Sequence, residues 1–348
     1  MAHVANITIQ SSKVPGDLTD YDVYVDLSDL GAPFWNTVAN GGGDIRVYKD
    51  DGVTELAREI INCDTATKTG QLHFKYTGTL SSSSNTIVKI HADGTSSDYA
   101  VTATYGRNNV WVDWEMVNHD GGATADSTGQ HTFSAVGSPT SGGVTAPTGV
   151  GTNFNGSSQY INTNANNLNV NNDYTLHAWI KMDVDQNPSP ILATGSNITN
   201  APGYWIWINR LASSNGLCMQ LDNGPGGADF VPNSSNRVNV ADGWSHIAMV
   251  RDGNNYKSYI NGSLADSGTL AKSGLNTTED ILIARLDYGS NYFHGSISEI
   301  RMRQDARSSD WIETSYNNQN DTSTFYTVTD ISGATLSTTK PMQPIWFF

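Results

Sequence analysis

Apolar and polar residues alternate over short runs along most of this chain, and Gly-containing turns separate the runs. In "DIRVY", Ile45 and Val47 fall on one face of an extended segment while the residues beside them fall on the other, which is the period of a half-buried β-strand. "DGWSHIAMVRDGNNYKSYING" predicts a β-hairpin, because Asp-Gly and Asn-Gly tolerate the positive φ that tight turns require. The pattern therefore predicts an all-β protein built from antiparallel sheets.

Two groups of such runs predict two domains. The runs from Ile7 to Ile90 predict an N-terminal β-sandwich within residues 1–105. A second domain is expected over residues 106–320, beginning with a joint strand and loop at 106–129, and residues 321–348 are expected to form a tail with an apolar tip. Only "SSDWIETSYNNQ" predicts a helix, with Ser308 or Ser309 as its N-cap.

Composition excludes several classes of function. The chain has 348 residues, of which 15% are charged, and its formal net charge is -15. Binding to nucleic acid phosphates or anionic lipid needs clustered Lys and Arg, which this acidic chain lacks. No run approaches the length of a membrane span, and "MAHVANITIQ" lacks the features of a signal peptide. The two cysteines, Cys63 and Cys218, are interpreted as free thiols.

Six segments occur in one order along the second half of the chain: "FNGSSQYI", "DYTLHAWIK", "DGWSHIAMVRDG", "YKSYING", "FHGSISEIRM" and "RSSDWIETSYNNQ". Together they closely resemble the LamG-like jelly roll, a concanavalin A-like β-sandwich, from about Trp114 to Asn320. The hairpin would then supply two neighbouring strands, with Trp244 and Ile260 packing between the sheets. The first part of the chain resembles the small β domain of unknown function that often precedes such jelly rolls. The resemblance implies two antiparallel β-sandwiches in tandem, and this fold alone does not give a function.

One pair of carboxylates raises the question of catalysis. Asp113 and Glu115 in "VDWEM" fall on the same side of a predicted strand, as in some concanavalin A-like glycosidases, and a retaining glycosidase needs two carboxyl groups about 5 Å apart. Val117 and Asn118 stand where the third carboxylate of that pattern belongs. We therefore interpret the pair as solvated or interdomain charges and predict no catalytic residue and no enzyme.

Calcium is the metal that the resemblance implies, because LamG-like domains often hold one at a loop rim and hard oxygen ligands suit it. The candidate ligands are Asp120 and Asp126 in the joint loop, and Asp222 and Asp229 in "LDNGPGGAD". Ser298 stands where the family frequently has an Asp. The simpler interpretation of each Asp is a turn-capping residue.

Two aromatic groups are candidates for contacts with other molecules. In "GYWIWINR", Trp205 and Trp207 share one face of a predicted strand, where they could stack on sugar rings while Asn209 and Arg210 bond hydroxyl groups; the alternative places both indoles in the core. "PMQPIWFF" ends in a cluster of three aromatic residues that predicts an assembly contact with another subunit, or a segment folded back on its own sheet. These tip residues are Trp346, Phe347 and Phe348.

These features favour a non-catalytic structural or binding protein, displayed on a surface, whose lectin-like jelly roll contacts glycans or cell-surface polysaccharide. The absence of a signal peptide and of disulfides, the acidic composition and the apolar tip favour a virion component such as a phage tail, fibre or capsid decoration. The first alternative is a bacterial surface or secreted carbohydrate-binding or adhesion protein, and a glycoside hydrolase ranks below it. A homo-oligomer is left open.

Overall fold

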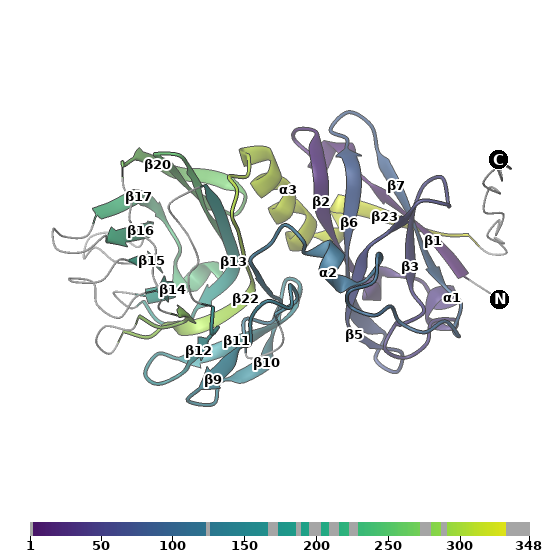
Figure 1. The fold of residues 1–348 in the computed structure, drawn as a ribbon, viewed down its shortest axis with the longest axis horizontal. Coiled ribbons are helices and arrows are strands. Elements are labelled where there is room, and N and C mark those ends of the chain that lie inside the picture. The colour runs from purple at the N-terminus through teal and green to yellow at the C-terminus, as the bar shows by residue number, and fades with distance from the viewer. Residues whose placement is uncertain are drawn as a thin grey trace, which may run out of the picture.

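The computed structural model describes residues 3–122, 126–165, 173–185, 189–194, 203–208, 216–222, 229–271, 280–286 and 291–331. Within 203–208, 216–222 and 229–237 it describes the backbone and, of the side chains, only that of Leu217. The prediction of an all-β protein is confirmed, because the described residues form four antiparallel sheets in two domains (Figure 1). None of the described helices is long and apolar enough to cross a membrane.

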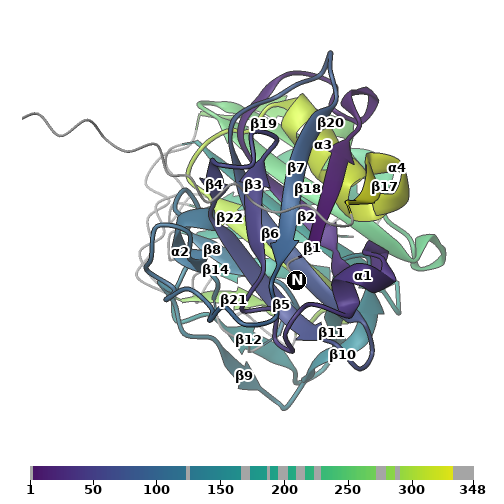
Figure 2. The same ribbon diagram turned by 90° about the vertical axis from the view of Figure 1, so that its right-hand side faces the viewer.

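The N-terminal domain is a sandwich of two sheets around a core that includes Ile7, Val23 and Phe74. Figure 2 shows the outer of the two sheets from the end of the molecule that this domain occupies. In order, this five-stranded sheet comprises β23 (Tyr326–Ile331), β1 (His3–Ile9), β7 (Thr86–Ala92), β3 (Arg46–Lys49) and β4 (Glu55–Leu56). The other sheet comprises β2 (Leu18–Asp26), β6 (Thr69–Leu80) and β5 (Arg58–Asp64).

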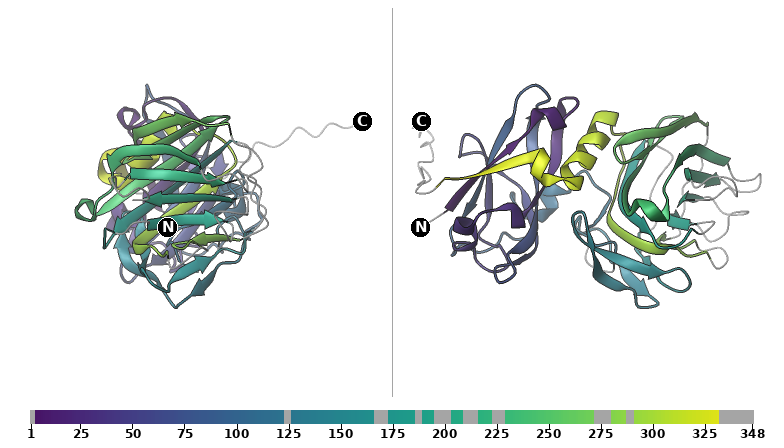
Figure 3. Two further views of the ribbon diagram at one scale, coloured as in Figure 1. Left: turned by 90° about the vertical axis from the view of Figure 1, so that its left-hand side faces the viewer. Right: turned by 180° about the vertical axis from the view of Figure 1, so that it is seen from behind.

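The chain returns to this domain after the jelly roll, and this corrects the prediction of a tail from residue 321. α4 (Thr322–Phe325) leads into β23, which pairs with β1 in antiparallel register from Val4–Ile331 to Ile9–Tyr326. β1 would otherwise be an unpaired edge strand, and β23 covers it. The N-terminal sandwich therefore contains strands that precede the jelly roll in the sequence and one strand, β23, that follows it. The jelly roll is an insertion into the sequence of this domain (Figure 3).

The second domain is a larger sandwich of two sheets, as the resemblance implied. The first sheet follows the order β10 (Thr140–Ala146), β11 (Gly149–Asn155), β22 (His294–Arg303), β13 (Tyr174–Met182), β18 (Trp244–Asp252), β19 (Asn255–Ile260) and β20 (Ser263–Thr269), and β8 (Met116–Asn118) also pairs with β22. The second follows the order β17 (Asp229–Arg237), β16 (Gly216–Asp222), β15 (Gly203–Ile208), β14 (Ser189–Thr194), β21 (Ile281–Ile283), β12 (Tyr160–Asn162) and β9 (Ser134–Val136). The core between them includes Leu176, Ile247 and Ile297.

The predicted hairpin is confirmed as β18 and β19, which turn at Gly253 with a φ of 58°. Ile260 packs against the core between the sheets, as predicted. The prediction for Trp244 is wrong, because this indole lies on the opposite face of β18 and donates from Nε1 to the Thr145 carbonyl at 3.0 Å. The alternation along β18 explains the difference, since Ile247 faces the core and the even-numbered positions face the other way.

α3 (Ser309–Asn320) joins the two domains and begins at the predicted cap, where the Ser308 side chain accepts from the Trp311 amide. Its Asn318 side chain bonds both the N–H and the carbonyl of Tyr24 in β2, at 2.8 Å each. Gln319 accepts from Nε1 of Trp179 in the jelly roll at 2.7 Å. The helix therefore fixes both domains by specific bonds from successive residues, and Figure 1 shows it standing between them.

Apolar packing continues across the domain boundary. The core of the N-terminal domain extends without interruption through Trp111 and Trp114 of the joint to Trp311 of α3 and Ala248 of β18. Large apolar interfaces oppose relative motion of domains. The remaining short helices are α1 (Ala32–Trp35), α2 (Arg107–Val110) and the 3₁₀ turns η1 (Ser11–Lys13), η2 (Leu27–Asp29) and η3 (Val240–Asp242).

Candidate functional site

A bulge in β22 directs the side chain of Glu299 into the space between the domains. The pairing of β13 with β22 shifts between His177 and Trp179, so that Glu299 and Ile300 together lie opposite one residue. Glu299 has a φ of 50°, which is uncommon for a residue other than glycine, and its side chain is fully buried. Bulges commonly re-aim a side chain, and here the redirected group is a carboxylate.

His119, in the joint between the domains, lies between two carboxylates. Its Nδ1 is 2.6 Å from Oε1 of Glu299, and its Nε2 is 3.1 Å from Oε2 of Glu59 in β5. Burial alone would lower the pKa of His119, but the charge of Glu299 and hydrogen bonds to both carboxylates raise it to about 9. An imidazolium donates from both nitrogens, so the protonated ring links the N-terminal domain to the jelly roll.

Each carboxylate in this network has further donors. Glu59 accepts from Nε1 of Trp111 at 2.5 Å and from Oγ of Ser127 at 2.7 Å. Glu299 accepts from Nε of Arg301 at 2.7 Å. Burial opposes ionisation of Glu299, but Arg301 and His119 hold its pKa below the ordinary range. The Ser127 hydroxyl bonds a carboxylate rather than an imidazole, so this group is not arranged for attack by a serine.

His73 of β6 extends the network into the N-terminal sandwich. Its ring stacks on His119, with centroids 4.4 Å apart, and burial followed by the charges of His119 and Arg301 lowers its pKa well below the ordinary value. Among the residues that the structure describes, His73, His119 and Glu299 are close enough to hold a metal ion, with ligand atoms within 4.8 Å. However, His119 already bonds a carboxylate through each nitrogen, and the Arg301 guanidinium beside Glu299 would repel a cation. We assign no metal to this group.

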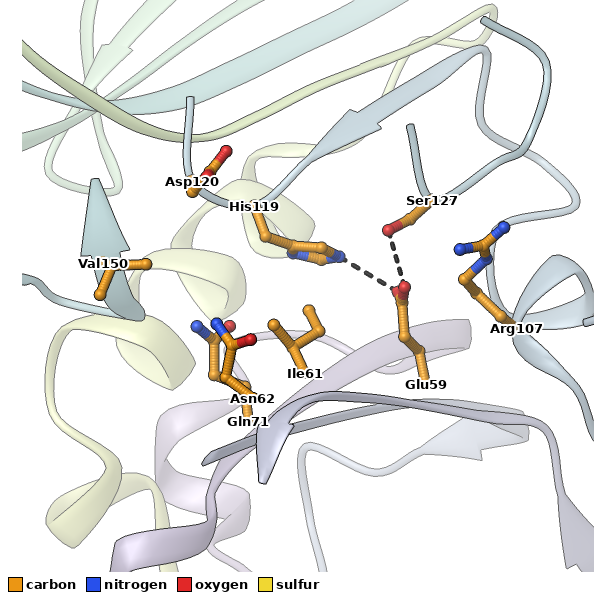
Figure 4. A pocket seen from close by; sticks show the side chains of 9 residues that line it. All are labelled: Glu59, Ile61, Asn62, Gln71, Arg107, His119, Asp120, Ser127 and Val150. Carbon is orange, nitrogen blue, oxygen red and sulfur yellow. Dashed lines mark hydrogen bonds and ion pairs between the residues drawn. The ribbon is translucent and has the colours of Figure 1, made fainter. Parts of the chain in front are cut away.

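A pocket of about 190 Å³ opens beside the network, and both domains line it (Figure 4). Its lining consists of Glu59, Ile61, Asn62 and Gln71 from β5 and β6, and of Arg107, His119, Asp120, Ser127 and Val150 from the joint and β11. A second cavity of about 340 Å³ shares Asn62, Gln71 and Val150 with it. The two cavities therefore adjoin, and amide, carboxylate and guanidinium groups suitable for bonding hydroxyl groups line the first.

The candidate calcium ligands of the joint loop have other partners. Asp126 is buried and accepts five hydrogen bonds, from the Val117 amide and from the backbone and side chain of the turn that follows it. A carboxylate offers about four lone-pair sites, so Asp126 has none left for a cation. Asp120 accepts from the Gly122 amide at 2.8 Å and lines the pocket. This geometry favours turn-capping over calcium binding at Asp126.

The remaining predicted binding residues lie partly outside the described residues. β15 is a central strand that places Ile206 opposite Leu192 and Ile208 opposite Leu217, both of which are buried core residues. The side chains of Trp205 and Trp207 are not described, and neither are those of Asp222 and Asp229. Asn209, Arg210, Trp346, Phe347 and Phe348 lie outside the described ranges. The sugar platform and the apolar tip therefore stay predictions.

The carboxylates of "VDWEM" do not share a strand, so that prediction is wrong. Asp113 lies in a turn and forms an ion pair with Lys75 of β6 across the domain boundary, while Glu115 precedes β8. Burial works against ionisation of Asp113, yet the bond from Lys75 lowers its pKa. Burial raises the pKa of Glu115. The chain turns after Trp111, whose carbonyl accepts from the Trp114 amide at 2.9 Å, and this prevents the strand alternation that was expected.

Cys63 is a buried thiol, and burial raises its pKa to about 11. A thiol with a raised pKa is a poor nucleophile, and Cys63 is a free thiol, as interpreted from the sequence. The side chain of Cys218 is not described.

Sequence reasoning did not find the network of Glu59, His119 and Glu299. These residues lie 60 and 180 positions apart along the chain, so no spacing marks them as a group. The one available signal is in "GSISEIRMR", where Glu299 places a carboxylate within a strand that is buried along almost its whole length.

Comparison with known proteins identifies the second domain. Residues 155–313 match the model of the concanavalin A-like lectin/glucanase superfamily. No match was found among curated protein sequences. Similar solved structures include domain 4 of an extracellular arabinanase from Geobacillus stearothermophilus, in complex with arabinotriose (18% identity, TM-score 0.46, 58% of this chain and 100% of that one).

They also include botulinum neurotoxin type C, from a structure concerned with its interaction with two ganglioside molecules (17% identity, TM-score 0.46, 61% of this chain and 52% of that one). A third is the binding domain of Paraclostridial Mosquitocidal Protein 1 (14% identity, TM-score 0.47, 59% and 52%). The chain thus spans about half the length of the two toxin chains. Residues 155–313 are thus similar to the concanavalin A-like lectin/glucanase superfamily, and the two-sheet sandwich that contains them agrees with that similarity.

Proposed function

We propose that this protein is a non-catalytic binding protein whose jelly roll, displayed on a surface, contacts glycans. The match of residues 155–313 to the lectin/glucanase superfamily is the observation that carries the proposal. The polar pocket between the domains supports it, because amides, carboxylates and an arginine are the groups that bond sugar hydroxyls.

The path of the chain supports display of the jelly roll. The chain enters the N-terminal sandwich on β1 and leaves it on β23, and Val4 lies opposite Ile331 where the two strands meet. Both strands belong to the sheet on the far side of this domain from the jelly roll (Figure 1). An attachment at this end would hold the jelly roll outward. We propose attachment to a virion, as part of a phage tail, fibre or capsid decoration, and the alternative is a bacterial surface or secreted adhesion protein.

The absence of catalysis is part of the proposal. Asp113 is committed to Lys75 and lies in the turn that precedes Glu115, so the two do not form the matched pair that a retaining glycosidase needs. The histidine between Glu59 and Glu299 bonds a carboxylate through each nitrogen. Both arrangements give these groups a structural role.

A glycan array combined with a hydrolysis assay tests the proposal. Purified protein is expected to bind a subset of the glycans on the array. In the hydrolysis assay it is expected to release no reducing ends from those glycans. Asp113→Asn together with Glu115→Gln is expected to leave binding unchanged. Hydrolysis by the wild-type protein that the double variant lacks would refute the non-catalytic assignment. Mass spectrometry of purified phage particles against cell-surface fractions separates the virion from the bacterial alternative.

A further inference from the structure

Arg107 differs from the other arginines at the domain boundary. Arg301 pairs with Glu299, while Arg303 and Arg307 both pair with Asp305. Arg107 forms no ion pair with any carboxylate in the part of the chain that the structure describes. Its Nε is buried and has no hydrogen-bond partner among those residues. In a chain with a net charge of -15, an arginine left without a carboxylate at a pocket needs an explanation.

Glu59, the carboxylate of the network that lines the same pocket, does not pair with Arg107. The Trp111 indole, the Ser127 hydroxyl and the His119 imidazolium already bond Glu59. The charges of His119 and Arg301 balance those of Glu59 and Glu299. Figure 4 shows the Arg107 guanidinium directed toward the side of the pocket where Ser127 and Glu59 meet. The guanidinium is therefore a positive charge that the network leaves uncompensated.

The opposite side of the pocket carries two neutral amides and one carboxylate. Asn62 and Gln71 lie across from Arg107, and Asp120 lies above them (Figure 4). Gln71 belongs to β6. Gly149, the first residue of β11, packs so closely on it that a Cβ built there would lie 2.3 Å from the Gln71 Nε2, so the two domains meet at this residue. A volume of about 190 Å³ has room for about six waters at ~30 Å³ each, which suits one sugar ring.

We propose that this interdomain pocket binds an acidic sugar, with the carboxylate of a uronic acid residue on Arg107 and its hydroxyl groups on the amides of Asn62 and Gln71. A guanidinium and a carboxylate form two parallel hydrogen bonds, which fix the orientation of the sugar as well as its charge. The proposal rests on the glycan-binding function above and names the class of glycan. Both domains form the pocket, because β5 and β6 supply the amides and β11 of the jelly roll supplies Val150, while the joint between them supplies the arginine.

Isothermal titration of the full chain with digalacturonate and with neutral galactobiose tests the proposal. We expect the acidic disaccharide to bind at least tenfold more tightly than the neutral one. Arg107→Gln is expected to abolish this preference, and Arg107→Lys to retain part of it, because lysine keeps the charge but not the paired geometry. Lys257→Gln, which removes an exposed charge on β19 outside the pocket, is the matched control and is expected to bind as the wild type does.

The outcomes separate this proposal from the proposed function. Equal affinity for the two disaccharides, unchanged in Arg107→Gln, would overturn the acidic-sugar assignment and leave glycan binding in place. An equal loss in Lys257→Gln would also overturn it, because the effect would then be general electrostatics. Failure to bind any glycan, acidic or neutral, on the array would refute both. Melting curves of the variants check that each is folded. If Arg107→Gln does not fold, Arg107→Lys still tests the proposal.

Discussion

Replacing His119 by glutamine should remove one component of the pH dependence of stability. The unfolded chain has an ordinary imidazole pKa of 6.5, whereas the folded protein raises the pKa of His119 to about 9. A raised pKa means that the folded state binds the proton more tightly. The resulting stability is fully present below pH 6.5 and is lost as the pH rises toward 9. At 1.36 kcal/mol per pH unit, this difference corresponds to about 3 kcal/mol.

Urea unfolding at pH 6.5 and pH 9.5, followed by tryptophan fluorescence, measures this contribution. Trp111 donates to Glu59 and lies against the His119 ring, so the signal reports on the interface. The wild type should lose about 3 kcal/mol more than His119→Gln between the two pH values. His294→Gln, in which the replaced histidine forms no ion pair with any described carboxylate, should behave as the wild type does. Parallel losses in the wild type and His119→Gln would refute the reasoning.

An NMR titration of His119 in the wild-type protein gives the same answer without a variant. The imidazole should remain protonated up to about pH 9, because Glu59 and Glu299 both accept from it. An ordinary titration near 6.5 would show that the carboxylates do not hold a proton on the ring.

Below pH 6.5 the stability of the protein is expected to fall because of two histidines whose pKa values are lowered, not raised, in the folded state. His177 and His246 face each other at 3.4 Å between the jelly roll and α3, among Trp114, Trp179 and Trp311. Burial, and then nearby positive charges, lower both pKa values, that of His246 to about 3. The unfolded chain therefore binds these protons first, and stability falls as the pH drops below 6.5. Stability should accordingly be greatest near pH 6.5.

Three further predictions concern other parts of the molecule. Asn318→Ala should lower the free energy of unfolding by about 3 kcal/mol, because it leaves the buried N–H and carbonyl of Tyr24 without partners. Asn320→Ala, at an exposed position of the same helix, is the control, and equal urea midpoints for the two variants would contradict the prediction. Trp205→Ala and Trp207→Ala should weaken glycan binding several-fold with little change in melting temperature if the indoles form a surface platform, whereas a loss of about 3–5 kcal/mol would place them in the core. Truncation before Lys340 should abolish assembly without changing the melting temperature, and a truncated protein that melts earlier yet still assembles would refute a docking role for the tip.

Much of the fold could be predicted because strand alternation and turn chemistry are local. The hairpin at Gly253 and the helix capped by Ser308 follow from a few adjacent residues each, and the structure confirms both. β23 could not be predicted in the same way. Its sequence, "YTVTDI", is a weak alternation whose partner strand begins at His3, more than three hundred residues earlier.

The candidate site was missed for a physical reason. Glu299 faces the interface only because a bulge shifts the register of β22, and a shift of one residue moves a side chain to the other face of a sheet. Strict alternation along the strand therefore does not predict where this carboxylate points. Glu59 and His119 then meet it through tertiary packing of three separate segments.

The buried network explains why the domains share one orientation. Apolar surfaces such as those of Trp111, Trp114 and Trp311 attract one another with little directional preference. A buried imidazolium between two carboxylates is different, because any other arrangement of the domains would leave charges unpaired away from water, which costs several kcal/mol. We infer that Glu59, His119 and Glu299 select the orientation that the apolar contacts stabilise. The interdomain pocket depends on that orientation, since Asn62 and Gln71 of the N-terminal domain line it together with Val150 of the jelly roll.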